Sequence, residues 1–210
     1  MKHTGIVLAA VLVIIGGVIA YMHAHPRPPR DEVLPDGVQG VTRPPALATG
    51  TMLVLRSPAV DNGGQLPVDY TGDGSAATLP LEWTGVPAGT RSLAVIMHHI
   101  PGPGDVKWYW VLYNIPAKVT SLPRNVTGLG TLGNNSINGR TEYAPPHSKG
   151  PGPKLYVYTV YALSAPPPVI VQPAEVSRAV LLDAMKGLVL DSAELHVVYT
   201  RQSLQDGEAK

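Results

Sequence analysis

The sequence predicts a mainly β protein, all-β apart from one helix, built as an antiparallel sandwich or barrel. Three observations support this. The 210 residues include 22 Pro and 22 Gly, a density typical of many short strands joined by turns. Several apolar runs have the length of a strand and lie between turn-rich segments. Only one segment, close to the C-terminus, has the character of a helix.

The elements follow in this order along the chain. Strands are expected at 52–57, twice within 81–99 (a short and a long strand around a Val-Pro-Ala-Gly turn), and at 107–116, 155–164 and 193–201. Irregular, turn-rich segments are expected at 61–80, 126–142 and 143–154. The helix is expected at 173–187, with Pro173 at its start and Gly187 suited to its C-terminal end.

The composition limits the classes of function. Hydrophobic residues make up 44% and charged residues 15%, which indicates a globular chain. The net charge of +1 does not favour a nucleic-acid partner. The chain has no Cys, which excludes disulfides, thiolate metal ligands and a Cys nucleophile.

The N-terminal segment 1–22 is expected to be a signal peptide or a membrane anchor. Residues 5–22 form an uncharged hydrophobic run after Lys2. The run is close to the roughly 20 apolar residues that span a bilayer as a helix, and it is long for a cleaved signal peptide. Cleavage after Ala20 and retention as an N-terminal hydrophobic helix both remain open. The protein is therefore expected to be exported, either membrane-anchored through this segment or secreted or periplasmic.

The segments that flank the folded domain differ from it in composition. Residues 23–50 are rich in proline and lack a periodic apolar pattern, which predicts an extended linker. The folded domain is expected at 51–203, followed by a polar tail at 204–210.

Two adjacent histidines end the long strand. Side chains alternate between the two faces of a strand, so His98 and His99 are predicted to point in opposite directions, unless the strand bulges before Pro101. A chelate formed by this pair alone is therefore not expected. By the same rule, Lys154 and Tyr156 share one face.

The segments LPLEWTGVPAGTRSLAV, YWVLYNIP, YVYTVYALS and AELHVVYTR, in this order and spacing, resemble the phosphatidylethanolamine-binding protein family, most closely its bacterial Raf-kinase-inhibitor-like branch. The resemblance covers about residues 52–202. It implies a two-sheet antiparallel sandwich with a C-terminal helix. It also implies a small pocket for phosphate-like or carboxylate anions at one end of the sandwich.

The resemblance also implies where the pocket residues lie. His99 and Pro101 stand at the family's two Asp positions, and Tyr109 stands where the family has a strand-opening His. By the same resemblance, the Gly-Pro loop becomes Ala144 and Pro145, and the His-Arg-Tyr triplet becomes Lys154, Leu155 and Tyr156. The family's acidic pocket residue is thus replaced, and Lys154 adds a cation. The implied ligand-binding residues are His99, Tyr109, Pro146, His147, Lys154, Tyr156 and Trp83.

These residues favour a binding protein for a small anion or lipid headgroup, with no catalytic residue, no metal site and no cofactor assigned. His99 and Lys154 would act as donors, Tyr109 and Tyr156 would contribute hydroxyls, and Trp83 and Pro146 would form apolar walls. Two alternatives stay open. One is a protein-interaction or inhibitor module with an unknown partner.

The other alternative is a metal- or histidine-dependent hydrolase. It would use His99 and His147, but a third metal ligand is not evident, with Asp105 or Glu142 as the available acids. No Gly-x-Ser-x-Gly nucleophile motif is present, and GLGTLG at 128–133 lacks the Lys-Ser/Thr of a phosphate-binding loop.

Overall fold

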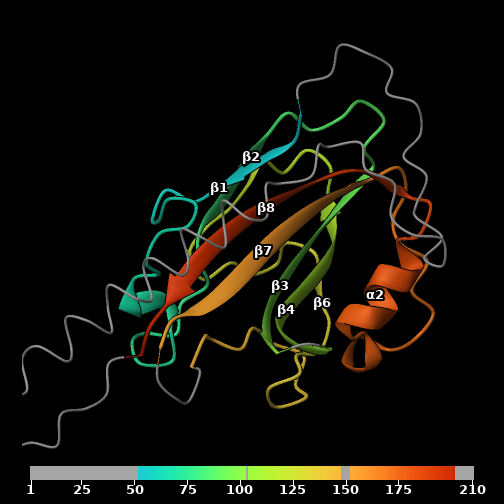
Figure 1. Ribbon diagram of the computed structural model, residues 1–210. Helices are drawn as coiled ribbons and strands as arrows, with labels where there is room; N and C mark the ends of the chain where they lie inside the picture. Colours follow the sequence, from blue (N-terminus) through green and yellow to red (C-terminus); the bar gives the residue numbers. More distant parts are fainter. Residues whose placement is uncertain (1–51, 103, 148–151, 202–210) are drawn as a thin grey trace, which may run out of the picture. The chain divides into compact units, whose positions relative to one another are not determined.

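The computed structural model describes residues 52–102, 104–147 and 152–201. Two antiparallel sheets account for the paired strands among them (Figure 1). The three-stranded sheet has the order β1 (Val54–Arg56), β2 (Leu81–Thr84), β5 (Ser121–Leu122). The five-stranded sheet has the order β6 (Thr131–Leu132), β4 (Asp105–Pro116), β3 (Ser92–Gly102), β7 (Lys154–Leu163), β8 (Val189–Tyr199).

The main core lies between the two sheets. Alternate residues of β2, Leu81 and Trp83, are buried while their neighbours are exposed. They belong to the same apolar cluster as Leu93, Val95 and Met97 from alternate positions of β3. Because each sheet contributes one face to a single core, the architecture is a sandwich, as the family resemblance implied.

A second core lies on the other face of the five-stranded sheet. The helix α2 (Arg178–Ala184) contributes Leu181, which packs with Ile96 of β3 and Val111 of β4. We call the face that packs against the three-stranded sheet the inner face, and the face that packs against α2 the helix side. Figure 1 shows β3, β4, β7 and β8 running as long neighbouring strands of this sheet.

The helix is shorter than the predicted 173–187. Residues Pro173–Glu175 form a separate 3-10 turn, and Val176 leaves helical geometry with ψ of 89°. The side chain of Ser177 then caps α2 by accepting a hydrogen bond at 3.2 Å from the backbone N–H three residues later. Between Pro173 and Gly187 the chain therefore forms two short helical segments rather than one continuous helix.

Other boundaries also differ from the prediction. β8 begins at Val189, four residues before the predicted start, and it pairs along its whole length with β7. The two-residue strands β5 and β6 lie in segments where no strand was predicted, because such short strands carry no periodic pattern.

Among the described residues, no helix is long and apolar enough to span a membrane. The predicted N-terminal hydrophobic helix, the linker at 23–50 and the tail at 204–210 lie outside the described residues.

Candidate functional site

The two adjacent histidines point to opposite faces of β3. The register pairs His98 with Val157 and His99 with Tyr156. His99 lies with its ring 5.2 Å from the ring of Tyr156, which belongs to the core between the sheets. His98 is on the helix side, within electrostatic reach of Arg178. The alternation expected from the sequence is therefore present in the structure.

His99, Tyr109 and Tyr156 form a contact group that we call the inner-face cluster. The rings of Tyr109 and Tyr156 meet edge to face at a centroid distance of 5.2 Å. Nδ1 of His99 lies 2.7 Å from the carbonyl oxygen of Leu155. Because a carbonyl only accepts hydrogen bonds, Nδ1 carries the proton and Nε2 is the atom available for other contacts.

A β-bulge positions Tyr109 within this cluster. In the β3–β4 register Met97 faces Trp110 and His98 faces Trp108, so Tyr109 is the extra residue between them. Tyr109 and Trp110, although adjacent in sequence, consequently both belong to the core between the sheets. Burial raises the pKa of the Tyr109 hydroxyl, which therefore stays protonated and able to donate at neutral pH.

Lys154 lies next to the inner-face cluster along β7. It is two residues before Tyr156, so both side chains leave the same face of the strand. Its partner in the register is Tyr199 of β8. Lys154 is partly exposed, whereas Tyr156 is fully buried. The cation therefore lies at the solvent-facing end of the group.

The loop at 143–147 forms hydrogen bonds with β4 on one side and with the segment around Gly72 on the other. The N–H of Ala144 donates to the carbonyl of Tyr109 at 2.8 Å, and the carbonyl of Pro146 accepts from the N–H of Gly72 at 2.8 Å. A Cβ at position 72 would lie 2.7 Å from the Cβ of His147, so only glycine permits this close approach. Pro146 is buried, as a wall residue would be.

His147 takes part in a polar group that sequence reasoning did not find, centred on Asp73. The Asp73 carboxylate lies 3.1 Å from Nε2 of His147 and 3.0 Å from Nη2 of Arg201. The Tyr199 hydroxyl donates to its other oxygen at 2.5 Å. In the sequence, the only local indication of this polar group is that Tyr199 and Arg201 stand two positions apart.

The hydrogen bond from Tyr199 lowers the pKa of Asp73, burial opposes it, and the charges of Arg201 and His147 lower the pKa further. A folded-state pKa below the ordinary value of 3.8 means that the carboxylate stabilises the fold above that pH. This contribution is lost as the pH falls through the lower folded-state value.

We therefore expect Asp73→Asn to flatten the acid limb of the stability profile. Urea unfolding of the wild type should show a loss of stability as the pH falls below about 4, and the variant should lose less over the same interval. The exposed Asp61→Asn should behave as the wild type. Equal acid sensitivity of Asp73→Asn and the wild type would contradict this role for the carboxylate.

Trp83 lies in β2, within the other sheet. Its side chain is 2% exposed, and its indole N–H donates to the carbonyl of Val119 at 2.9 Å. These contacts describe a core residue, and its predicted part as a ligand-facing wall stays a prediction.

Of the seven predicted site residues, the structure joins three in direct ring contact. It places Lys154 beside them and gives His147 the separate partner Asp73. Within the described part of the chain, no three His, Asp or Glu side chains are grouped as a metal site would require.

Two antiparallel sheets packed face to face, with a helix on the outer side of the larger one, define the β-sandwich class. The model of the phosphatidylethanolamine-binding protein family matches residues 56–200. The chain belongs to the phosphatidylethanolamine-binding protein family, which confirms the resemblance drawn from the sequence.

Individual relatives agree with this assignment. A UPF0098 protein of Methanothermobacter thermautotrophicus is 34% identical over 121 residues, covering 56% of this chain and 78% of its own. The crystal structure of a phosphatidylethanolamine-binding protein homologue from Chlamydia trachomatis superposes with a TM-score of 0.65 at 26% identity, covering 72% of this chain and 99% of that one. YbcL of Escherichia coli gives a TM-score of 0.64 at 26% identity, with 72% and 100% covered.

Proposed function

We propose that this chain is an exported binding protein that holds a small anionic ligand, a phosphate-like or carboxylate headgroup, at the inner-face cluster. The observation that carries the proposal is the convergence of His99, Tyr109 and Tyr156 at one end of the inner face, with Lys154 beside them. Family membership supports a binding role.

The uncharged run at 5–22 supports export. Fractionation of cells that produce the chain, with mass measurement of the recovered protein, tests export and cleavage after Ala20. Recovery of the intact chain from the cytosol alone would contradict export.

The donors of this group suit an oxyanion. Lys154 supplies a charge at the edge of the cluster, and the protonated Tyr109 hydroxyl supplies an oriented donor. His99 engages a backbone carbonyl through Nδ1, so it donates to a ligand through Nε2 only as an imidazolium.

The contacts of Asp73 limit the positive charge that the site offers to a ligand. Its carboxylate already lies within ion-pair distance of Arg201 and contacts His147, so the charge of Arg201 is partly neutralised. Lys154 is the cation that lies beside the inner-face cluster on the same face of β7. This balance favours a small, singly or doubly charged headgroup over a large polyanion.

We expect Lys154→Ala to weaken anion binding by about tenfold, the loss of one charge-assisted contact. The measurement is a titration of the isotope-labelled 210-residue chain with inorganic phosphate, phosphorylethanolamine and acetate, followed by amide chemical shifts. Lys118→Ala is the matched control, because Lys118 is an exposed lysine beyond the far end of β4.

The wild type should respond at residues around His99, Tyr109 and Tyr156, and Lys118→Ala should respond equally. Absence of a response to all three probes at millimolar concentration would refute the proposal. An undiminished response in Lys154→Ala would remove Lys154 from the site. The three probes distinguish a simple phosphate or carboxylate site from one that requires the amine of a lipid headgroup.

A further inference from the structure

A second hollow lies on the helix side of the five-stranded sheet, away from the inner-face cluster. Its volume is about 670 Å³, within the range of small-molecule sites. It lies between the start of β4, the loop at 134–139 and the start of α2. We call it the helix-side hollow, and its polar and aromatic lining comprises Asp105, Lys107, Trp108, Asn134, Ser136 and Arg178.

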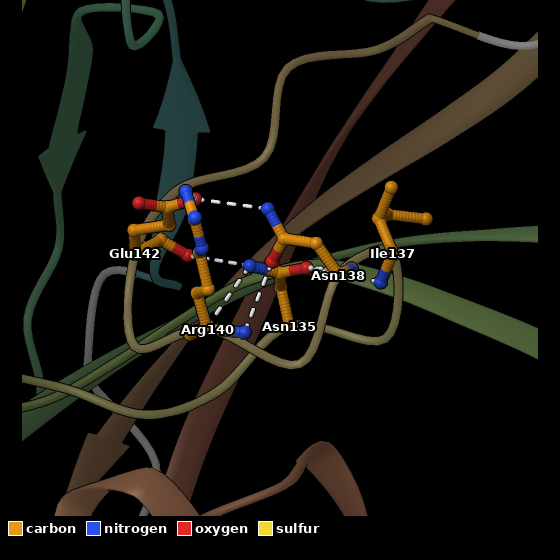
Figure 2. Close-up of polar contacts among 5 residues, drawn as sticks. All are labelled: Asn135, Ile137, Asn138, Arg140 and Glu142. Carbon is orange, nitrogen blue, oxygen red and sulfur yellow. Dashed lines mark hydrogen bonds and ion pairs between the residues drawn. The ribbon is translucent and has the colours of Figure 1, made fainter.

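One wall of the hollow is a loop held by its own hydrogen bonds (Figure 2). Asn135 is 1% exposed, and its amide donates to the carbonyls of Arg140 and Glu142. Its side-chain oxygen accepts from the backbone N–H groups of Ile137 and Asn138. All four hydrogen-bonding positions of this buried amide are thus used, which fixes the shape of the wall.

Most polar groups that line the hollow already have partners. The indole N–H of Trp108 donates to the backbone and side-chain oxygens of Asn134, at 3.1 and 3.2 Å. The Ser136 hydroxyl accepts from the N–H of Trp108 and donates to its carbonyl. Lys107 lies 3.2 Å from the Asp105 carboxylate. These groups therefore do not require a ligand.

Arg178 is different. Its Nε is buried, and within the described residues it has no hydrogen-bond partner. With Asp105 and Lys107 paired to each other, Arg178 adds one further positive charge to the lining of the hollow. The Glu194 carboxylate acts electrostatically on the same region, but its oxygen lies 2.9 Å from Nε2 of His196.

His98 adds an independent observation. It is 8% exposed, and its Nδ1 is buried without a hydrogen-bond partner in the part of the chain that the structure describes. It is the register partner of Trp108, which lines the hollow. Burial lowers the pKa of His98, and the charge of Arg178 lowers it further, so the imidazole is neutral at neutral pH. Arg178 and His98, on α2 and β3, are thus neighbours on the helix side, and within the described residues the buried Nε of one and Nδ1 of the other have no hydrogen-bond partner.

We propose that Arg178 anchors a second ligand site in the helix-side hollow, for a small carboxylate or phosphate oxyanion. The planar guanidinium binds two oxygens of such a group at once, and the prearranged loop and Trp108 shape the space around it. His98 lies behind this contact as a neutral neighbour. The site uses none of the residues of the inner-face cluster, so the experiment that tests it is independent of the test of the proposed function.

The test is a titration of the labelled 210-residue chain with inorganic phosphate and, separately, acetate at constant ionic strength. The readouts are the indole N–H signal of Trp108, assigned with Trp108→Phe, and the amides of 134–139. Arg178→Gln should weaken binding by at least about tenfold, and Arg178→Lys should weaken it less because it keeps the charge but loses the fork. Lys186→Gln, two residues beyond the end of α2, and Lys154→Ala on the inner face should bind as the wild type at these signals.

Saturable shifts of these signals with either anion, lost in Arg178→Gln and kept in both controls, support the site. Unmoved signals with both anions at millimolar concentration overturn it. Equal affinity of Arg178→Gln and the wild type also overturns it. If thermal melting shows that Arg178→Gln is unfolded, Arg178→Lys decides: undiminished affinity in that variant rejects the guanidinium as the anchor.

Discussion

Trp83→Ala should lower the free energy of unfolding by about 3–5 kcal/mol, because it removes a large buried side chain and leaves a cavity. Trp83 is 2% exposed in the core between the sheets. The change also removes the indole hydrogen bond to the carbonyl of Val119. The measurement is urea unfolding followed by circular dichroism, since fluorescence would be altered by the loss of the indole itself.

A matched control separates burial from the mere loss of apolar atoms. Ile170 is 96% exposed, and Ile170→Ala should change the stability by no more than about 0.5 kcal/mol. If Trp83→Ala left stability almost unchanged but abolished the response to anions, Trp83 would be a ligand-facing wall rather than a core residue.

Tyr156→Ala should combine a large loss of stability with loss of the anion response. The side chain is fully buried and contacts both His99 and Tyr109, so truncation should lower the free energy of unfolding by about 3–5 kcal/mol. Because His99 and Tyr109 both pack on this ring, the cluster should lose its geometry. Urea unfolding and phosphate titration measure the two effects.

Tyr156→Phe distinguishes the ring from the hydroxyl. It keeps both ring contacts, so the fold should be largely retained while anion binding weakens. Tyr113→Phe is the control, since Tyr113 is a buried tyrosine of β4 in the helix-side core. If Tyr156→Phe bound phosphate as tightly as Tyr113→Phe, the Tyr156 hydroxyl would have no part in the site.

The strands of the sandwich were predictable because their signals are local. Alternation in 81–84 and the apolar runs ending at His99 and Pro116 mark buried faces, and the flanking Pro and Gly residues mark their ends. Alternation likewise separated His98 from His99 and placed Lys154 beside Tyr156. The helix was predictable in position but not in length, since the break at Val176 depends on how this segment packs.

The site could be predicted only in part. The family resemblance led to His99, Tyr109 and Tyr156, and these three are in contact. The bulge that turns Tyr109 inward follows from the pairing of β3 with β4, and no residue of β4 signals it locally.

The sequence by itself determined the family, through the order and spacing of several segments, and the set of long strands. It also determined that His98 and His99 lie on opposite faces, because alternation depends only on neighbouring residues. Only the tertiary structure decided that Asp73 meets Tyr199, 126 positions away, and His147. It also decided that Arg178 and His98 share the helix side, each with a buried nitrogen that has no hydrogen-bond partner in the described ranges. Such contacts join segments that are far apart in the sequence, and neither segment by itself predicts the contact. Only the packing of both sheets and the helix brings these segments together.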